Sequence, residues 1–137
     1  MAKLRHLAIT VKDLEASAKF YEDVFEMKRI FQAGDRAIYL TDGLMNLAII
    51  AGPGNKSSGA EGRLGLHHFG FRVDDFKKAE ADLAAAGATY VCDLGDPKGM
   101  NYERKWVDAE GILFDISEKG WYGALDETAQ DKEPALS

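Results

Sequence analysis

The sequence predicts an α+β fold built from two paired βαβββ modules, and three observations support this. Residues 6–14 and 68–76 open the two halves with the same pattern, in which His, Val, Asp and a large apolar residue coincide at an offset of 62. Each half then continues with a helical pattern and three short extended runs. A Gly- and Ser-rich stretch at residues 51–65 separates them. One module alone would expose a sheet face, so the halves are expected to pair.

The first half begins with a predicted strand at residues 4–11, which is rich in β-branched and apolar residues. Asp13 is a suitable N-cap for the helix that follows. The apolar residues after it recur at helical spacing: Leu14, Ala18, Tyr21 and Phe25. Three extended runs then complete the module, at residues 28–32, 36–41 and 44–50.

The second half repeats this order, starting with a predicted strand at residues 66–73. Asp74 or Asp75 can cap the second helix, whose buried stripe is Phe76, Ala79 and Leu83, and Gly87 suits its C-terminal end. The remaining strands are predicted at residues 89–93, 102–107 and 112–117. We therefore expect a single domain over residues 1–124 and a flexible acidic tail at 125–137, the domain dividing into module one at 3–50, a linker at 51–65 and module two at 66–120.

Composition narrows the classes of function. The chain of 137 residues has 23 acidic against 17 basic side chains, a formal charge of −6, which disfavours nucleic acid or an anionic membrane as a partner. It has no apolar window of about 20 residues and no signal-peptide pattern at its start, so a cytoplasmic protein is expected. Cys92 is the only cysteine, which excludes an internal disulfide and a multi-thiolate zinc site.

Strand alternation groups three ionisable side chains as a candidate metal site. His6 shares a strand face with Leu4, Ala8 and Thr10, while the alternate residues are those that a helix would cover. The same parity places His68 and Asp115 on the faces not needed for helix packing, and His67 on the covered face. A lone strand histidine is often a hydrogen-bonded core residue. Two at equivalent positions of a repeat, with a carboxylate on a third strand, favour a divalent metal site.

The chain resembles the vicinal oxygen chelate superfamily. The resemblance rests on the two His-x-x-x-x-Val-x-Asp-Leu/Phe openings and on the Asp-Ala-Glu-Gly-Ile-Leu-Phe-Asp run at residues 108–115, and it covers residues 3–123. This group includes glyoxalase I, methylmalonyl-CoA epimerase, type I extradiol dioxygenases and antibiotic-resistance proteins. The resemblance implies that the modules form an open, eight-stranded, barrel-like sheet with the helices outside and the metal ligands on the first and last strands.

Carried over position by position, the resemblance implies His6, His68 and Asp115 as metal ligands, with aspartate where the family has glutamate. The fourth ligand position of glyoxalase I and the epimerases falls on Leu47, which cannot coordinate a metal. A 2-His-1-carboxylate site favours Fe(II), with Zn, Mn or Ni as alternatives. Aspartate shortens the arm by roughly 1.5 Å, one C–C bond. A closer strand, a bridging water or loss of the metal are the three ways to accommodate this.

Further site residues are expected around the ligands. Tyr102, Arg104 and Trp106 share one face of the seventh strand: Tyr102 is the candidate proton donor and the other two are candidate substrate contacts. Glu103 and Lys105 lie on the opposite face and are expected in solvent, with a role of Glu103 as proton donor or base as the alternative. Arg72, on the His68 face, is a candidate for binding a substrate carboxylate or for pairing with an acid. Trp121 is expected to close the pocket or to anchor a subunit contact.

The sequence thus favours a metal-dependent enzyme of the glyoxalase or extradiol dioxygenase type, which chelates a small oxygenated metabolite through two oxygens. Dioxygenase chemistry is the first expectation, with lyase or isomerase chemistry on another divalent ion second. The alternatives are a metal-free protein that binds a drug or another ligand, as bleomycin-resistance proteins do, and a degenerate member with a structural role. The resemblance also implies a homodimer.

Overall fold

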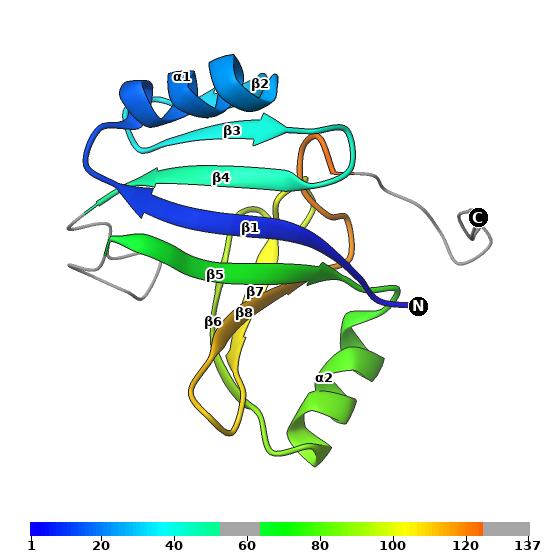
Figure 1. Cartoon of the computed structure of the whole chain (residues 1–137). Coiled ribbons are helices and arrows are strands. Elements are labelled where there is room, and N and C mark those ends of the chain that lie inside the picture. Colours follow the sequence, from blue (N-terminus) through cyan, green and yellow to red (C-terminus); the bar gives the residue numbers. More distant parts are fainter. Residues whose placement is uncertain (53–63, 125–137) are drawn as a thin grey trace, which may run out of the picture.

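The computed structural model describes residues 1–52 and 64–124, so most of the predicted linker and the whole predicted tail lie outside the described residues. The elements are, in order, β1 (Lys3–Val11), α1 (Leu14–Phe25), β2 (Lys28–Ala33), β3 (Ala37–Thr41), β4 (Asn46–Ala51), β5 (Gly65–Arg72), α2 (Phe76–Ala85), β6 (Thr89–Leu94), β7 (Glu103–Val107) and β8 (Leu113–Ser117) (Figure 1). Neither helix in this part of the chain is long and apolar enough to cross a membrane.

The strands form one mixed sheet in the order β2-β3-β4-β1-β5-β8-β7-β6. Within each module the first strand pairs in parallel with the last, β1 with β4 and β5 with β8. The two modules join through the antiparallel pairing of β1 with β5, and Figure 1 shows the sheet curving away from this junction on both sides. The predicted α+β fold of two βαβββ modules is therefore confirmed.

Each helix is started by an aspartate and held by an apolar cluster. The Asp13 carboxylate accepts a hydrogen bond from the Ala16 amide at 3.0 Å, and Asp75, one of the two predicted caps, accepts from the Lys77 amide at 2.8 Å. Helix α1 packs Ala18 into a cluster with Ile38, Leu40 and Ile49, and α2 packs against a second cluster made of Val73, Trp106, Phe114 and Ile116. The inner face of the sheet is left for other residues.

A bulge in β1 changes one predicted side-chain direction. The register pairs Leu4 with Phe71 and then His6 with Gly70, so the alternation breaks at Arg5. Leu4 therefore shares the outer face with Phe71, and the prediction that it lies on the His6 face is wrong. His6, Ala8 and Thr10 remain together and are buried on the inner face.

The chain that follows β8 returns to the first module. The Asn46 side-chain amide donates to the Tyr122 carbonyl at 2.8 Å, and the Thr41 hydroxyl donates to the Gly123 carbonyl at 2.6 Å. Gly123 has φ +77°, and a Cβ there would lie 2.7 Å from Thr41 Cβ, so this crossing requires glycine. We call residues 118–124 the strap, because they tie the last strand of module two to β3 and β4.

Gly70 on β5 lies so close to Trp121 that an added Cβ would sit 2.8 Å from the indole ring. Since Trp121 is buried and cannot swing into solvent, we expect Gly70→Ala to lower the free energy of unfolding by about 1–3 kcal/mol through overpacking. Gly99→Ala is the matched control, since its Cβ would meet only ordinary contacts at 3.6 Å. Urea unfolding of both variants tests this, and equal midpoints for the two would contradict the tight approach.

Candidate metal centre

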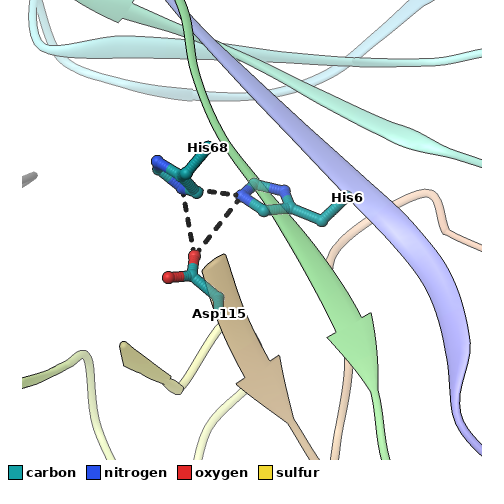
Figure 2. A group of neighbouring side chains, drawn as sticks. All are labelled: His6, His68 and Asp115. Atoms are coloured by element: carbon teal, nitrogen blue, oxygen red, sulfur yellow. Dashed lines mark hydrogen bonds and ion pairs between the residues drawn. The ribbon is translucent and has the colours of Figure 1, made fainter. Parts of the chain in front are cut away.

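Three side chains from three strands bring one donor atom each to a common point on the inner face (Figure 2). His6 Nε2 lies 3.3 Å from His68 Nε2 and 3.7 Å from Asp115 Oδ2, and His68 Nε2 lies 3.0 Å from the same carboxylate oxygen. All three residues are buried. The structure thus brings together, from β1, β5 and β8, the three residues that the sequence predicts as metal ligands.

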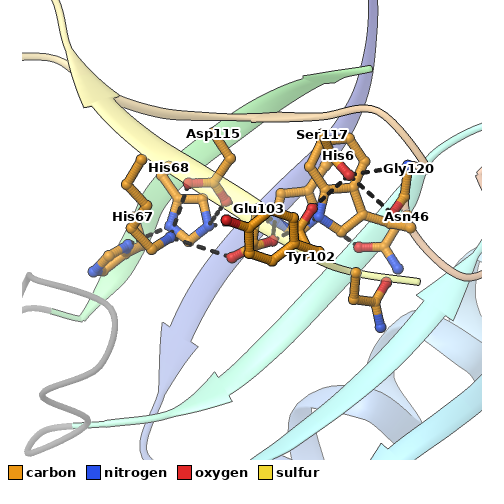
Figure 3. Close-up of polar contacts among 12 residues, drawn as sticks. His6, Asn46, His67, His68, Tyr102, Glu103, Asp115, Ser117 and Gly120 are labelled. Carbon is orange, nitrogen blue, oxygen red and sulfur yellow. Dashed lines mark hydrogen bonds and ion pairs between the residues drawn. The ribbon is translucent and has the colours of Figure 1, made fainter. Parts of the chain in front are cut away.

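Asn46 fixes the tautomer of His6. Its amide nitrogen donates to the Tyr122 carbonyl, so its Oδ1, 2.7 Å from His6 Nδ1, must accept a hydrogen bond from the imidazole. Neutral His6 then carries its hydrogen on Nδ1 and presents a lone pair at Nε2. Figure 3 shows Asn46 beside the His6 ring. Asn46 therefore orients His6 for binding through Nε2.

Burial keeps both imidazoles neutral. Burial lowers the pKa of His6, although the carboxylates of Glu103 and Asp115 oppose this shift. Burial, assisted by the Lys105 ammonium, lowers the pKa of His68 to about 3. His68 Nδ1 lies 2.6 Å from His67 Nδ1, so a hydrogen on His68 Nδ1 has an acceptor there and leaves Nε2 as a ligand.

The geometry of these atoms fits a divalent ion. Bonds of about 2.1 Å to N and O at angles between 90° and tetrahedral separate neighbouring donors by about 3.0–3.4 Å. The three observed separations, 3.0, 3.3 and 3.7 Å, lie close to this range. Asp115 Oδ2 is buried without a hydrogen-bond donor among the described residues, which is costly unless a cation satisfies it. Asp115 therefore reaches the two histidines without the extra methylene of glutamate.

The second oxygen of Asp115 is held by Lys105. Lys105 lies directly opposite Asp115 on β7, and its Nζ is 2.8 Å from Asp115 Oδ1. Burial alone would lower the pKa of the Lys105 ammonium, but the attraction of Glu103 and Asp115 outweighs it and raises this pKa overall. Asp115 is consequently available to a metal through one oxygen only.

Glu103 and Trp121 form a wall beside His6. The Trp121 indole stacks on the His6 ring with centroids 4.6 Å apart and donates to Glu103 Oε1 at 2.6 Å. This carboxylate oxygen lies 4.0 Å from His6 Nε2, and Glu103 Oε2 lies 3.4 Å from Lys105 Nζ. The prediction that Glu103 and Lys105 face solvent is wrong.

The other site residues predicted on the seventh strand, Arg104 and Trp106 in β7 and Tyr102 just before it, lie on the outer face. Arg104 pairs with Ile116 and Trp106 with Phe114, so both point toward α2, where they donate to Glu80 at 2.6 and 2.9 Å. Tyr102 donates to Asp93 at 2.7 Å. These three residues do share a face, as the alternation predicts, but the structure places it away from the metal centre. Their expected catalytic and substrate-binding roles do not fit this position.

Arg72 also lies apart from the ligands. It is at the end of β5, where its guanidinium pairs with Asp74 at 3.2 Å. This matches the alternative expectation for Arg72, pairing with an acid, rather than contact with a substrate. Trp121, by contrast, is where a pocket residue was expected.

The fourth ligand position does not fall on Leu47. The register of β1 with β4 places Asn46 beside His6, while Leu47 packs against the cluster under α1. Asn46 and Ala48, on either side of Leu47, are the buried inner residues of this part of β4. Counting four residues from Gly43 therefore misses the inner face by one position. The position of Lys105 also follows from strand register. If Val107 is paired with Leu113 across the β7–β8 hairpin, Lys105 lies opposite Asp115.

The two histidines open into a cavity of about 270 Å³ between the modules' inner faces. Its wall includes Glu103, Lys105 and Trp121 at the metal centre and the exposed Arg36 at its mouth. This volume suits a small metabolite or one end of a larger one.

An open mixed sheet of two βαβββ modules with two histidines and a carboxylate at its centre defines a class of protein. Residues 3–116 match the Glyoxalase/Bleomycin resistance protein/Dioxygenase superfamily, and the chain belongs to this family. No curated protein has a significant sequence match to the chain.

Several solved structures have the same fold. A methylmalonyl-CoA epimerase variant from Streptomyces coelicolor, in complex with 2-nitronate-propionyl-CoA, is 19% identical with a TM-score of 0.67 over 83% of this chain and 94% of its own. The Mn(II)-bound glyoxalase from Novosphingobium aromaticivorans is 17% identical with a TM-score of 0.66 over 93% and 42%. A hypothetical protein from Bacillus halodurans is 15% identical with a TM-score of 0.68 over 95% and 99%. At these identities the likeness shows the fold alone.

Two substitutions of Asn46 are expected to change metal affinity to different extents, because only one of them keeps an acceptor for His6 Nδ1. Asn46→Leu removes the acceptor for His6 Nδ1 and is expected to weaken Co(II) binding by about 10–100-fold. Asn46→Asp keeps an acceptor and is expected to retain affinity within about tenfold, although it loses the bond to the Tyr122 carbonyl. Competition with a chromophoric chelator measures both. If the two variants lose affinity equally, Asn46 acts only by anchoring the strap.

Proposed function

We propose that this protein is a divalent-metal-dependent enzyme that chelates a small oxygenated metabolite through two oxygens and moves a proton next to the chelated group. The observation that carries the proposal is the placement of Glu103. Its carboxylate lines the same cavity as His6 and His68 but stands outside the group of three ligands. A base beside a chelating centre is the arrangement that isomerase and lyase chemistry requires.

The chain's own residues have distinct roles in this proposal. His6, His68 and Asp115 would hold the ion. A bound divalent ion would act as a Lewis acid that polarises a substrate carbonyl, and iron(II) would also be able to activate dioxygen. Glu103 removes the proton next to that carbonyl, and the Trp121 N–H fixes the carboxylate in direction. Trp121 and the buried inner faces of the strands exclude water from the centre.

Iron(II) dioxygenase chemistry is the second candidate. The observation that favours it is the three-ligand set, since neither Ala48 nor Asn46, which bonds His6, supplies a fourth ligand. A 2-His-1-carboxylate set leaves adjacent positions open for a substrate and dioxygen. Fe(II) is the ion expected for this chemistry, and Zn, Mn or Ni for proton transfer. A protein without metal would instead favour the ligand-binding alternative.

The metal assignment predicts that purified protein, reconstituted without oxygen, binds about one equivalent of a divalent ion. His6→Ala, His68→Ala and Asp115→Ala are each expected to lower the bound metal below about a tenth of an equivalent, because each removes a ligand. Glu103→Gln is the matched control, which keeps a side chain of the same shape in the same cavity and is expected to retain the metal. Elemental analysis with circular dichroism measures content and fold, and full metal in all three ligand variants would refute the site.

The same control variant separates the two candidate reactions. With Zn or Mn bound, the wild-type protein is expected to catalyse exchange with D₂O of the hydrogens next to the keto group of an α-keto carboxylate, and Glu103→Gln to slow it by about 10²-fold or more. Proton NMR measures the exchange. Oxygen uptake with Fe(II) and catechols, unaffected by Glu103→Gln, would instead support the dioxygenase.

We also propose that the protein is a homodimer, joined through the outer face of the central strands. Helix α1 packs on β2, β3 and β4, and α2 on the second module, while Leu7, Leu66 and Ile112 are exposed between them. Leu66 is 74% exposed on this apolar surface, which a second copy of the same surface would bury.

This interface predicts that Leu66→Glu converts the dimer into a monomer, because it places a charge at the centre of the apolar contact. Leu44→Glu, at another exposed leucine in the loop before β4, is the control and is expected to leave the dimer intact. Light scattering after size-exclusion chromatography measures the mass. A wild-type monomer, or a dimer unaffected by Leu66→Glu, would contradict the proposed interface.

A further inference from the structure

Lys105 is a buried cation to which the proposed mechanism gives no substrate contact. It is 1% exposed, it lies on the inner face of β7, and it lines the cavity together with His6 and His68. Lysine is seldom buried unless it is paired, and here it has carboxylates on two sides.

The Lys105 ammonium has one more hydrogen-bond donor than the described residues around it accept. An ammonium group has three N–H donors and no acceptor. Among the described residues, Lys105 Nζ donates to Asp115 Oδ1 at 2.8 Å and to Glu103 Oε2 at 3.4 Å. These two bonds hold the group at the cavity wall and leave the third N–H for an oxygen that enters the cavity.

With a divalent ion bound, the buried charges at the centre would not sum to zero. Asp115 and Glu103 contribute two negative charges and Lys105 one positive charge, while imidazoles that bind a metal are neutral. A divalent ion at His6, His68 and Asp115 therefore brings the buried total to +1. A buried charge without a partner is costly, so a ligand with one negative charge completes the site. Arg36 contributes little to this charge balance because it is exposed and screened by solvent.

We propose that Lys105 binds an anionic oxygen of the substrate with its third N–H, and that the site selects substrates that chelate as monoanions. This class includes α-hydroxy and α-keto carboxylates and singly ionised catechols. The inference rests on the proposed metal centre and names the substrate class of that site. It makes Lys105 a substrate-binding residue in addition to its hold on Asp115.

Three small chelators of different charge test this proposal on the Mn(II)-loaded full-length protein: glycolate as the monoanion, hydroxyacetone as a neutral analogue and oxalate as the dianion. Water-proton relaxation of the bound Mn(II) reports their binding without requiring turnover. We expect Lys105→Met to weaken glycolate binding by about tenfold or more and hydroxyacetone binding by less than about twofold. Lys105→Arg keeps the charge and is expected to stay within about threefold for glycolate.

Glu103→Gln tests the charge balance while keeping Lys105 and its shorter bond to Asp115. It raises the metal-bound total from +1 to +2, so oxalate is expected to gain about tenfold over glycolate relative to the wild type. An unchanged ratio would overturn the charge argument. This arm also keeps the proposal falsifiable if Lys105→Met does not fold.

The metal content of each protein separates two kinds of failure. If the wild-type protein binds no metal, the proposed function fails and this inference fails with it. If metal is bound in full and Lys105→Met weakens the binding of glycolate and hydroxyacetone equally, or weakens the binding of neither, then Lys105 is only a positioning residue for Asp115. That result would overturn the monoanion proposal and leave the metal centre standing.

Discussion

The antiparallel pairing of β1 with β5 is the contact on which the rest of the molecule depends. It joins the two modules through the second edge of each first strand, and its register, with His6 opposite Gly70 and Ala8 opposite His68, brings the two imidazoles to the same side. Asp115 then follows because β8 pairs with β5, and Lys105 and Glu103 follow because β7 pairs with β8. One line of backbone hydrogen bonds thus positions residues that are more than 100 positions apart in the chain.

The site concentrates charge where the fold offers little water. Two carboxylates, one ammonium and two imidazoles share the inner face, and burying such groups generally costs more than their mutual attraction returns. Replacing the Lys105–Asp115 pair by apolar residues would therefore suit stability at least as well. The arrangement is explained by what it positions: one free carboxylate oxygen, one imidazole of defined tautomer and one carboxylate held beside them.

The sequence carries the fold and the three ligands because both follow from local pattern and repetition. The repeat finds His6 and His68 as equivalent positions, and period-two alternation places Asp115 on the inner side. Alternation says which residues share a face but not which face is inside, so Glu103 and Lys105 were assigned to solvent. Which face of β7 lies inside depends on its register with β8. In the same way, the register of β4 with β1 decides which residue lies beside His6. The stacking of Trp121 on His6 has no local signal at all, because the strap reaches it across the whole domain.

The strap gives the order of synthesis a direct consequence for the centre. A chain leaves the ribosome from its N-terminus, so His6 emerges early and the strap that supports it, through Asn46 and the Tyr122 carbonyl, emerges only after β8. A nascent chain carrying only the first module holds one of the three ligands, and one that ends before β8 holds two. Neither fragment presents the complete donor set. On the proposed assignment, loading with metal would therefore wait until translation has passed both modules and all three donor atoms are in place.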